Sequence, residues 1–211
     1  TYSDGINDDV NKMLWSALEW DPNANSDDIL LEYSRYFLGE KHGSDGAKGL
    51  MAFEDNWAGP LADHAGIEKN LARWQAIEAS DSQAMKSNWR LQLCVLRAYY
   101  DAYVQRRLNF ETALEEQALK TLERAADTGA VPSVKAAGVL LAQAADQPEN
   151  IKELRTRLVE LGKYLWQSIG MQLDVENYKA RNAERGAVLE FLDTPLNDRD
   201  WLDLEFESIS G

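Results

Sequence analysis

Cysteine and histidine are scarce in this sequence. Its 211 residues include one cysteine, Cys94, and two histidines, His42 and His64. A single cysteine excludes an intrachain disulfide, and two histidines far apart in sequence do not predict a zinc site. We therefore expect no cofactor, and we place His42 and His64 at the surface and Cys94 in the core.

The sequence also has few positively charged residues and no long apolar run. The chain has 22 Lys and Arg against 36 Asp and Glu, a net charge of -14. Nucleic acids and anionic membranes bind proteins through positive charge, so we expect neither as a partner. No uninterrupted apolar run approaches the ~20 residues that cross a bilayer, and no signal segment opens the sequence at Thr1. We expect a mature or excised part of a larger protein.

The sequence contains no motif of a common catalytic site, neither a nucleophile elbow nor a P-loop nor a dinucleotide fingerprint. Adjacent acids such as Glu115 and Glu116 point in different directions on a helix, which is typical of a solvated face and not of a glycosidase pair. Arg97 and Arg107 precede Glu111 and these acids, which predicts ion pairs between helices. We assign no catalytic residue.

What the sequence does contain is helical spacing of apolar residues along almost its whole length. Trp89, Leu93, Leu96 and Tyr100 recur at intervals of four and three residues, and a similar stripe runs through 151–169. Strand-like alternation is nearly absent, and no solenoid repeat is found. We predict an all-α fold, an irregular antiparallel bundle of about eight to ten helices in a single domain.

Caps and helix breakers predict the helix boundaries. Ser26 as N-cap and Gly39 bound one helix, and the next begins near Ser44 and ends at Gly59-Pro60. The other predicted helices cover 67–79, 82–108, 110–128, 132–145, 149–169, 179–192, and a short segment containing Trp201 and Phe206.

One polar segment has the ligand spacing of a calcium-binding loop. Its oxygen-bearing side chains occupy positions one, three, five, seven and twelve of such a loop. These residues are Asp21, Asn23, Asn25, Asp27 and Glu32. Position six holds Ser26 instead of glycine, and position eight holds Asp28 instead of an apolar residue. We therefore favour a turn followed by an N-capped helix and keep a calcium site as the alternative.

Two further sets of residues have both a structural and a functional interpretation. Ser3, Asp4, Asn7 and Asp8 form a polar opening that predicts a helix start, because acids are favoured at helix N-termini. If a catalytic barrel preceded them, they would lie at the rim of its substrate cleft. Flat aromatic faces stack on sugar rings, and the candidates for exposure are Trp57 and Trp201. A buried position is favoured for both, and Trp15, Trp89 and Trp166 are predicted core anchors.

Residues 15–39 carry a composite motif: Trp-x4-Trp-Asp-Pro, a polar turn, an acidic N-cap, and Ile-Leu-x2-Tyr-x3-Phe-x-Gly. This motif resembles the helical region that follows the (β/α)8 barrel in glycoside hydrolases, namely family 67 α-glucuronidases and family 20 and 84 hexosaminidase-like enzymes. The resemblance extends over residues 2–39, and no catalytic residue of those enzymes falls within this chain. Segments 98–103, 167–172 and 184–187 also resemble a bacterial family of large exported proteins.

The resemblance implies a non-catalytic accessory domain packed against a carbohydrate-active barrel upstream in the same polypeptide. The barrel would bind the oligosaccharide. Ser3, Asp4, Asn7 and Asp8 would then approach that cleft. Two alternatives stay open, because fold analogy does not determine function. A helical scaffold for a protein or peptide predicts a concave apolar patch. An independent enzyme predicts a helical toroid with acids and aromatic residues around a cleft.

Overall fold

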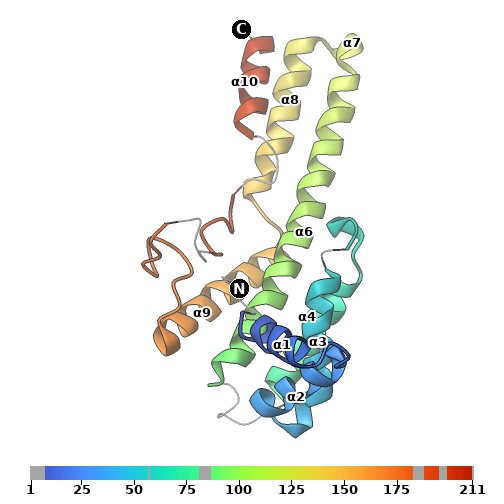
Figure 1. The fold of residues 1–211 in the computed structure, drawn as a ribbon. Coiled ribbons are helices and arrows are strands. Elements are labelled where there is room, and N and C mark those ends of the chain that lie inside the picture. Colours follow the sequence, from blue (N-terminus) through green and yellow to red (C-terminus); the bar gives the residue numbers. More distant parts are fainter. Residues whose placement is uncertain (1–7, 57, 81–86, 183–187, 195–198, 211) are drawn as a thin grey trace. The chain divides into compact units, whose positions relative to one another are not determined.

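The computed structural model describes residues 8–56, 58–80, 87–182, 188–194 and 199–210 (Figure 1). Within these ranges it contains nine α-helices, three short 3-10 turns and no strand. The all-α prediction and the predicted number of helices are confirmed. None of the helices in these ranges is long and apolar enough to cross a membrane.

The residues group into two compact units, whereas the chain length predicted one core. Unit 1 comprises Thr1–Ala102 and Thr156–Leu192, and unit 2 comprises Tyr103–Arg155 and Asp193–Gly211. Different helices cover the two parts of the longest helix, so two groups of apolar side chains are buried separately.

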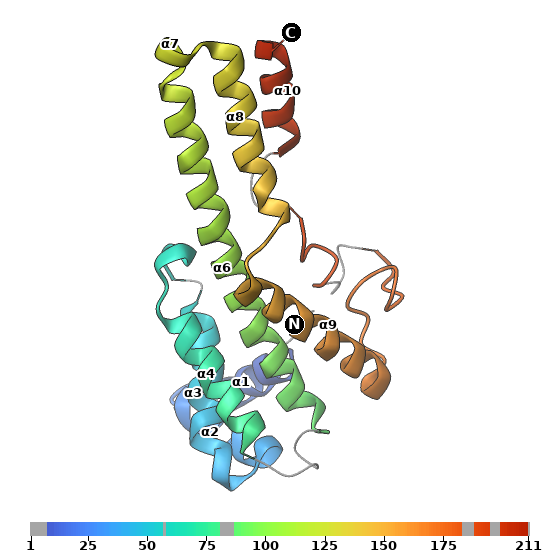
Figure 2. The ribbon, with the colours of Figure 1, turned by 180° about the vertical axis from the view of Figure 1, so that it is seen from behind.

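Unit 1 is built from four short helices and parts of two long ones (Figures 1 and 2). The short helices are α1 (Asp8–Trp20), α2 (Ser26–Leu38), α3 (Gly43–Asp55) and α4 (Gly66–Ala79). The long helices are α6 (Trp89–Glu123), which contributes its first part, and α9 (Glu149–Ile169), which contributes its later part.

The N-cap of α2 is Asn25, one residue before the predicted Ser26. The Asn25 Oδ1 atom accepts a hydrogen bond from the backbone N–H of Asp27 at 2.8 Å. The helix ends where predicted, because Gly39 has a φ of 85° and its N–H donates to the Arg35 carbonyl at 3.0 Å. Glycine accepts this left-handed region without strain.

Helix α3 packs closely against its neighbours through buried glycines. Gly46 lies against Leu38 and Ser34 of α2, and Gly49 lies against the indole of Trp74 on α4. Trp74 is fully buried, and its ring stacks on that of Phe53 with centroids 5.7 Å apart. This small-residue face lets the backbones approach, so the α2–α3–α4 core depends on the absence of side chains there.

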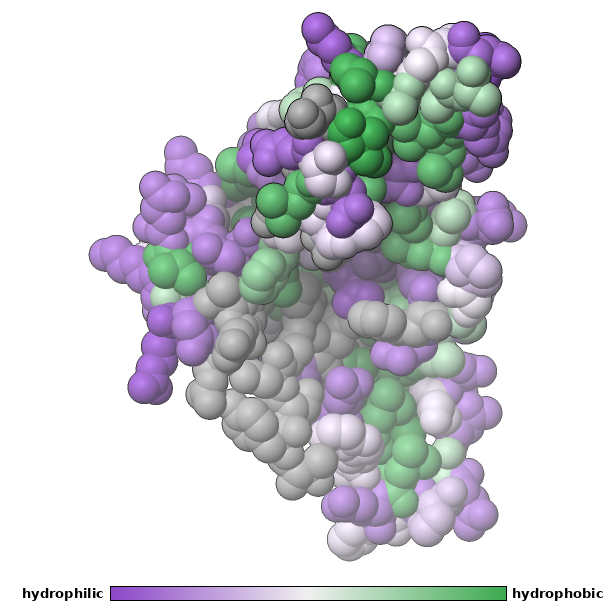
Figure 3. Space-filling model, turned by 90° about the horizontal axis from the view of Figure 1, so that it is seen from above, coloured by the Kyte–Doolittle hydropathy of each residue, from purple (hydrophilic) through white to green (hydrophobic). Residues whose placement is uncertain are grey.

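In unit 2, helix α8 (Ala130–Ala142) lies between the later part of α6 and α10 (Arg199–Ser210) in both ribbon views (Figures 1 and 2). The short helix α7 (Ala125–Thr128) and Gly129, whose φ is 90°, reverse the chain, so α6 and α8 run antiparallel. Viewed from above, hydrophobic residues gather between hydrophilic ones at the near end of this unit (Figure 3). The buried cluster contains Ala118, Ala137 and Leu141, with Leu122, Leu140, Leu202 and Phe206 packed against it.

Two predicted boundaries are wrong. The helices predicted at 82–108 and 110–128 are one continuous helix over most of that length, α6. Asn109 between them lowers helix propensity only slightly, whereas the real interruption falls at Arg124. The helix predicted at 179–192 is absent from the described part of that range, where the chain forms turns. Lys179, at the start of that range, has a φ of 57°, outside the right-handed helical region, and the N–H of Leu189 donates to the carbonyl of Leu173 at 2.9 Å and not to a carbonyl one turn earlier.

Helix α3 ends at Asp55, four residues before the predicted end at Gly59-Pro60, because Asn56 already caps it. The other boundaries agree with the caps and breakers. Helix α9 has the predicted bounds, α10 contains Trp201 and Phe206, and α1 begins with acids in its first turn. The predicted helix at 132–145 is α8 followed by a 3-10 turn at Gln143–Ala145.

Candidate functional site

Most residues of the predicted cleft rim lie outside the described residues. These are Ser3, Asp4 and Asn7, and the same holds for the aromatic candidate Trp57. Asp8 is described, in the first turn of α1, where it forms an ion pair with Lys12 one turn later. An acid at this place is stabilised by the helix dipole.

The candidate calcium loop uses its side-chain oxygens on its own backbone. Asp21 Oδ1 accepts the N–H of Asn23 at 2.9 Å, and Asn25 caps α2. Asp27 and Glu32 are exposed on α2. Among the described residues no group of three or more His, Cys, Asp or Glu is placed to hold a metal ion. The geometry is that of a turn followed by a capped helix.

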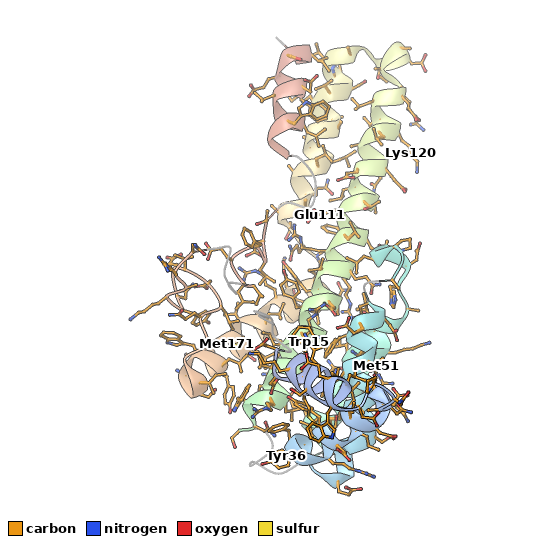
Figure 4. The ribbon with its side chains drawn as sticks, viewed as in Figure 1. Trp15, Tyr36, Met51, Glu111, Lys120 and Met171 are labelled. Atoms are coloured by element: carbon orange, nitrogen blue, oxygen red, sulfur yellow. The ribbon has the colours of Figure 1, made fainter. Side chains whose placement is uncertain are left out.

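Several aromatic residues are more exposed than predicted. Trp15, a predicted core anchor, is 39% exposed, because α1 fully buries only Val10 and turns Trp15 away from that side. Trp20 is 92% exposed at the end of the same helix, and Tyr36 of α2 is 82% exposed. Figure 4 shows Trp15 and Tyr36 at separate places on α1 and α2. Trp201 is also exposed, whereas Trp89 and Trp166 are half-buried.

The predictions for histidine and cysteine have mixed outcomes. His42 is buried and its Nε2 lies 3.3 Å from Ser80 Oγ, so its predicted surface position is wrong. His64 is half-buried against the carbonyl of Asp55, 2.9 Å away. Cys94 is buried as predicted, and burial raises the pKa of its thiol.

Arg97 and Arg107 of α6 form ion pairs within that helix, not between helices as predicted. Arg97 pairs with Asp101 at 2.7 Å, and Arg107 pairs with Glu111 at 2.6 Å. Because the predicted break at Asn109 does not exist, Arg107 and Glu111 lie one turn apart on one helix. Burial raises the pKa of Asp101, while Arg97 and a hydrogen bond from Asn56 partly offset the effect.

A second polar cluster connects α1, α2 and α6 within unit 1. The Asp9 carboxylate accepts hydrogen bonds from the Tyr33 hydroxyl and from Arg90 Nε, both at 2.8 Å. The Arg90 guanidinium also lies 3.8 Å from the centroid of the Phe37 ring. Burial and the neighbouring Asp9 raise the pKa of Tyr33. All polar atoms named here are engaged with one another, so the cluster is structural.

Helices α4, α6 and α9 of unit 1 enclose a groove of about 660 Å³. We call it the polar groove, because most of its lining side chains carry amide, carboxylate, guanidinium or phenol groups. The lining residues are Gln75, Glu78, Ala79, Gln92, Tyr99, Arg157, Glu160, Leu161 and Tyr164. Its volume lies in the range of small-molecule sites, ~300 to 1,000 Å³.

Glu78 is the centre of the hydrogen bonds in the polar groove. Its Oε1 accepts from Arg157 Nη2 at 2.7 Å and from the buried Gln92 at 3.2 Å. Arg157 Nη1 also donates to Glu160 Oε2 at 3.1 Å. Burial acts to lower the pKa of Arg157, but the two carboxylates outweigh it and the pKa is raised. The guanidinium therefore stays charged and holds both carboxylates in place.

Unit 2 has an apolar groove of about 290 Å³ between α6, α8 and α10. Its lining residues are Glu115, Ala118, Leu119, Leu122, Leu141, Trp201, Leu202 and Phe206. Glu115 is the only charged residue among them. The groove thus offers apolar contacts and almost no directional polar ones.

Neither groove was predicted from the sequence, because the lining residues come from helices far apart along the chain. A partial signal exists in Gln92, a polar residue directly between the apolar Leu91 and Leu93. Both grooves offer side chains that can contact a bound ligand. Comparison with protein-family models, with curated proteins and with solved structures gives no match.

Proposed function

We propose that this chain is a non-catalytic helical accessory domain of a carbohydrate-active protein, and that its α1–α2 hairpin packs against a catalytic barrel in the same polypeptide. The supporting observation is how the composite motif at 15–39 divides. Its second half is explained by the fold, since Ile29, Leu30 and Tyr33 are buried and Gly39 caps α2. The fold does not explain the first half of the motif, Trp-x4-Trp-Asp-Pro.

The tryptophans of that first half contribute little to the core. Trp20 is almost fully exposed and Trp15 is well exposed, and Tyr36 on the neighbouring helix is exposed too. Large aromatic side chains are usually mostly buried, and at protein interfaces they are enriched and supply much of the binding energy. A partner that covers α1 and α2 would explain why aromatic residues occupy these positions.

The test begins with the reading frame on the N-terminal side of this sequence, which we expect to encode alternating strands and helices of a barrel. In that longer protein, the double variant Trp20→Ser/Tyr36→Ser should lower the melting temperature by several degrees. In the 211-residue chain alone it should change the unfolding free energy by less than ~0.5 kcal/mol, as exposed substitutions do.

The matched control is Leu119→Ser, which changes an exposed apolar residue of unit 2. It should lower neither the melting temperature of the longer protein nor the unfolding free energy of the 211-residue chain. A frame without a barrel would overturn the proposal. So would equal effects of Trp20→Ser/Tyr36→Ser in the long and the short protein, since no partner would then cover these side chains.

The apolar groove favours a second candidate function, a helical scaffold that binds a protein or peptide. Its lining by leucines and two aromatic residues suits the apolar face of an amphipathic helix. If this is the function, Leu122→Glu should abolish capture of such a helix, whereas Trp20→Ser should leave capture unchanged.

A further inference from the structure

We propose that the polar groove between α4, α6 and α9 binds a short stretch of neutral oligosaccharide. This goes beyond the proposed docking of α1 and α2, because no residue of the polar groove lies on those helices. The chain itself would then contact a glycan, whether or not a barrel accompanies it.

The polar groove supplies both donors and acceptors of hydrogen bonds. Sugar hydroxyls both donate and accept, so they need side chains of both kinds. Gln75 Nε2 donates to the Tyr99 hydroxyl at 2.9 Å, which leaves the phenol proton for an acceptor in the groove. Glu78 Oε2 and the Tyr164 hydroxyl form no hydrogen bond with any part of the chain that the structure describes.

The polar groove carries charged side chains of both signs. One guanidinium, Arg157, is shared by the carboxylates of Glu78 and Glu160. An anionic ligand would face two carboxylates against a single guanidinium, so the net negative charge of the groove disfavours it. A neutral ligand avoids this repulsion and can still accept hydrogen bonds from Arg157 or donate them to Glu160.

The polar groove combines flat aromatic rings with an apolar side chain. Tyr99 and Tyr164 are half-buried, so each ring is fixed by packing and still partly reaches the groove. Leu161, an apolar lining residue of the same groove, is buried. Sugar rings have apolar C–H faces as well as hydroxyl edges, and a phenol ring can pack on such a face while its hydroxyl bonds to an edge.

The polar side chains of the groove are preorganised by contacts with one another. Gln92 is buried, Arg157 is held by two carboxylates, and Glu78 accepts two hydrogen bonds. These side chains are already ordered, so a ligand need not immobilise them. Binding loses less free energy when the rotamers of a site are set in advance.

The experiment titrates the 211-residue chain with neutral hexasaccharides of glucose, xylose and N-acetylglucosamine, and with a polygalacturonate oligomer as the charged comparison. Tryptophan fluorescence and calorimetry give the dissociation constants. At least one neutral hexasaccharide should bind with a Kd of about 1 mM or tighter. The charged oligomer should bind at least tenfold more weakly.

Two variants test the site itself. Tyr164→Ala removes a ring and hydroxyl, and Glu78→Gln keeps the shape of the side chain while removing its charge and one acceptor. Each should weaken binding at least tenfold, with circular dichroism unchanged. The matched controls are Tyr36→Ala and Glu116→Gln, exposed residues of the same types outside the groove, and both variants should bind as the parent chain does.

No saturable binding of any neutral hexasaccharide would overturn the inference, as would tighter binding of the charged oligomer. Binding that survives both groove variants would overturn it too, because the site would lie elsewhere. All of these outcomes are independent of the reading-frame test, so the failure of one proposal is distinguishable from the failure of the other.

Discussion

Replacing Gly49 with alanine tests whether α3 and α4 pack as closely as the structure indicates. A Cβ atom at Gly49 would lie 2.6 Å from Cζ2 and 2.7 Å from Cε2 of Trp74. Trp74 cannot move away freely, because it is fully buried and stacked on Phe53 with the ring planes 2° apart. The contact therefore has to be relieved by shifting a helix.

Two effects of opposite sign decide the outcome. Alanine is better than glycine inside a helix by ~1 kcal/mol. Overpacking a well-packed core costs ~1 to 3 kcal/mol, and here the new atom meets a rigid ring. We expect Gly49→Ala to lower the free energy of unfolding by about 1 to 2 kcal/mol.

The control is the same substitution at Gly138, in the middle of α8. There the nearest described atom to a new Cβ is Phe206 Cδ2 at 3.8 Å, an ordinary van der Waals distance. Gly138→Ala should raise the free energy of unfolding by ~0.5 to 1 kcal/mol. Urea titrations followed by circular dichroism measure both. If Gly49→Ala is as stabilising as Gly138→Ala, the close approach to Trp74 is wrong.

Two further predictions concern charged groups in unit 2. Glu111→Ala removes the carboxylate from the buried Arg107 and should cost about 3 kcal/mol in urea unfolding; a cost under ~1 kcal/mol would mean that water solvates the pair. The hydrogen bond from Arg155 lowers the pKa of Asp193 in the folded chain. The stabilisation that the Asp193 carboxylate contributes is thus present above the ordinary aspartate pKa of ~3.9. It is lost as the pH falls through the lower pKa that Asp193 has in the folded chain. Because Asp193 is half exposed, this amounts to less than ~1 kcal/mol. Asp193→Asn should therefore flatten the acid limb of the stability profile, and an unchanged limb would contradict the assignment.

The comparison of predicted and observed helices shows which local signals are reliable. Helix α9 has the predicted bounds because a long apolar stripe lies between Pro148 and Gly170, two residues that end helices. The predicted break at Asn109 has no such residue, and packing on both sides keeps α6 continuous. At 179–192 the apolar pattern is too short to impose a helix, and Lys179, with a φ of 57°, lies outside the right-handed helical region.

The aromatic residues show the limits of spacing as a guide to burial. Trp15 and Trp74 both occur in helices with apolar neighbours, yet one is exposed and the other fully buried. Which face of a helix is covered depends on the helices that pack against it. Trp74 is buried because Gly49 leaves room for its ring, a relation between residues twenty-five positions apart.

The helical class, most helix ends and the acidic surface follow from the sequence alone, because they arise from local backbone preferences, caps and composition. The two separate cores, the polar groove and the exposed tryptophans were decided by the tertiary structure. Each depends on contacts between helices that are distant along the chain: Glu78, Gln92 and Arg157 meet only when α4, α6 and α9 pack together. Local propensity sets where a helix begins and ends, whereas burial and proximity are properties of the packed molecule.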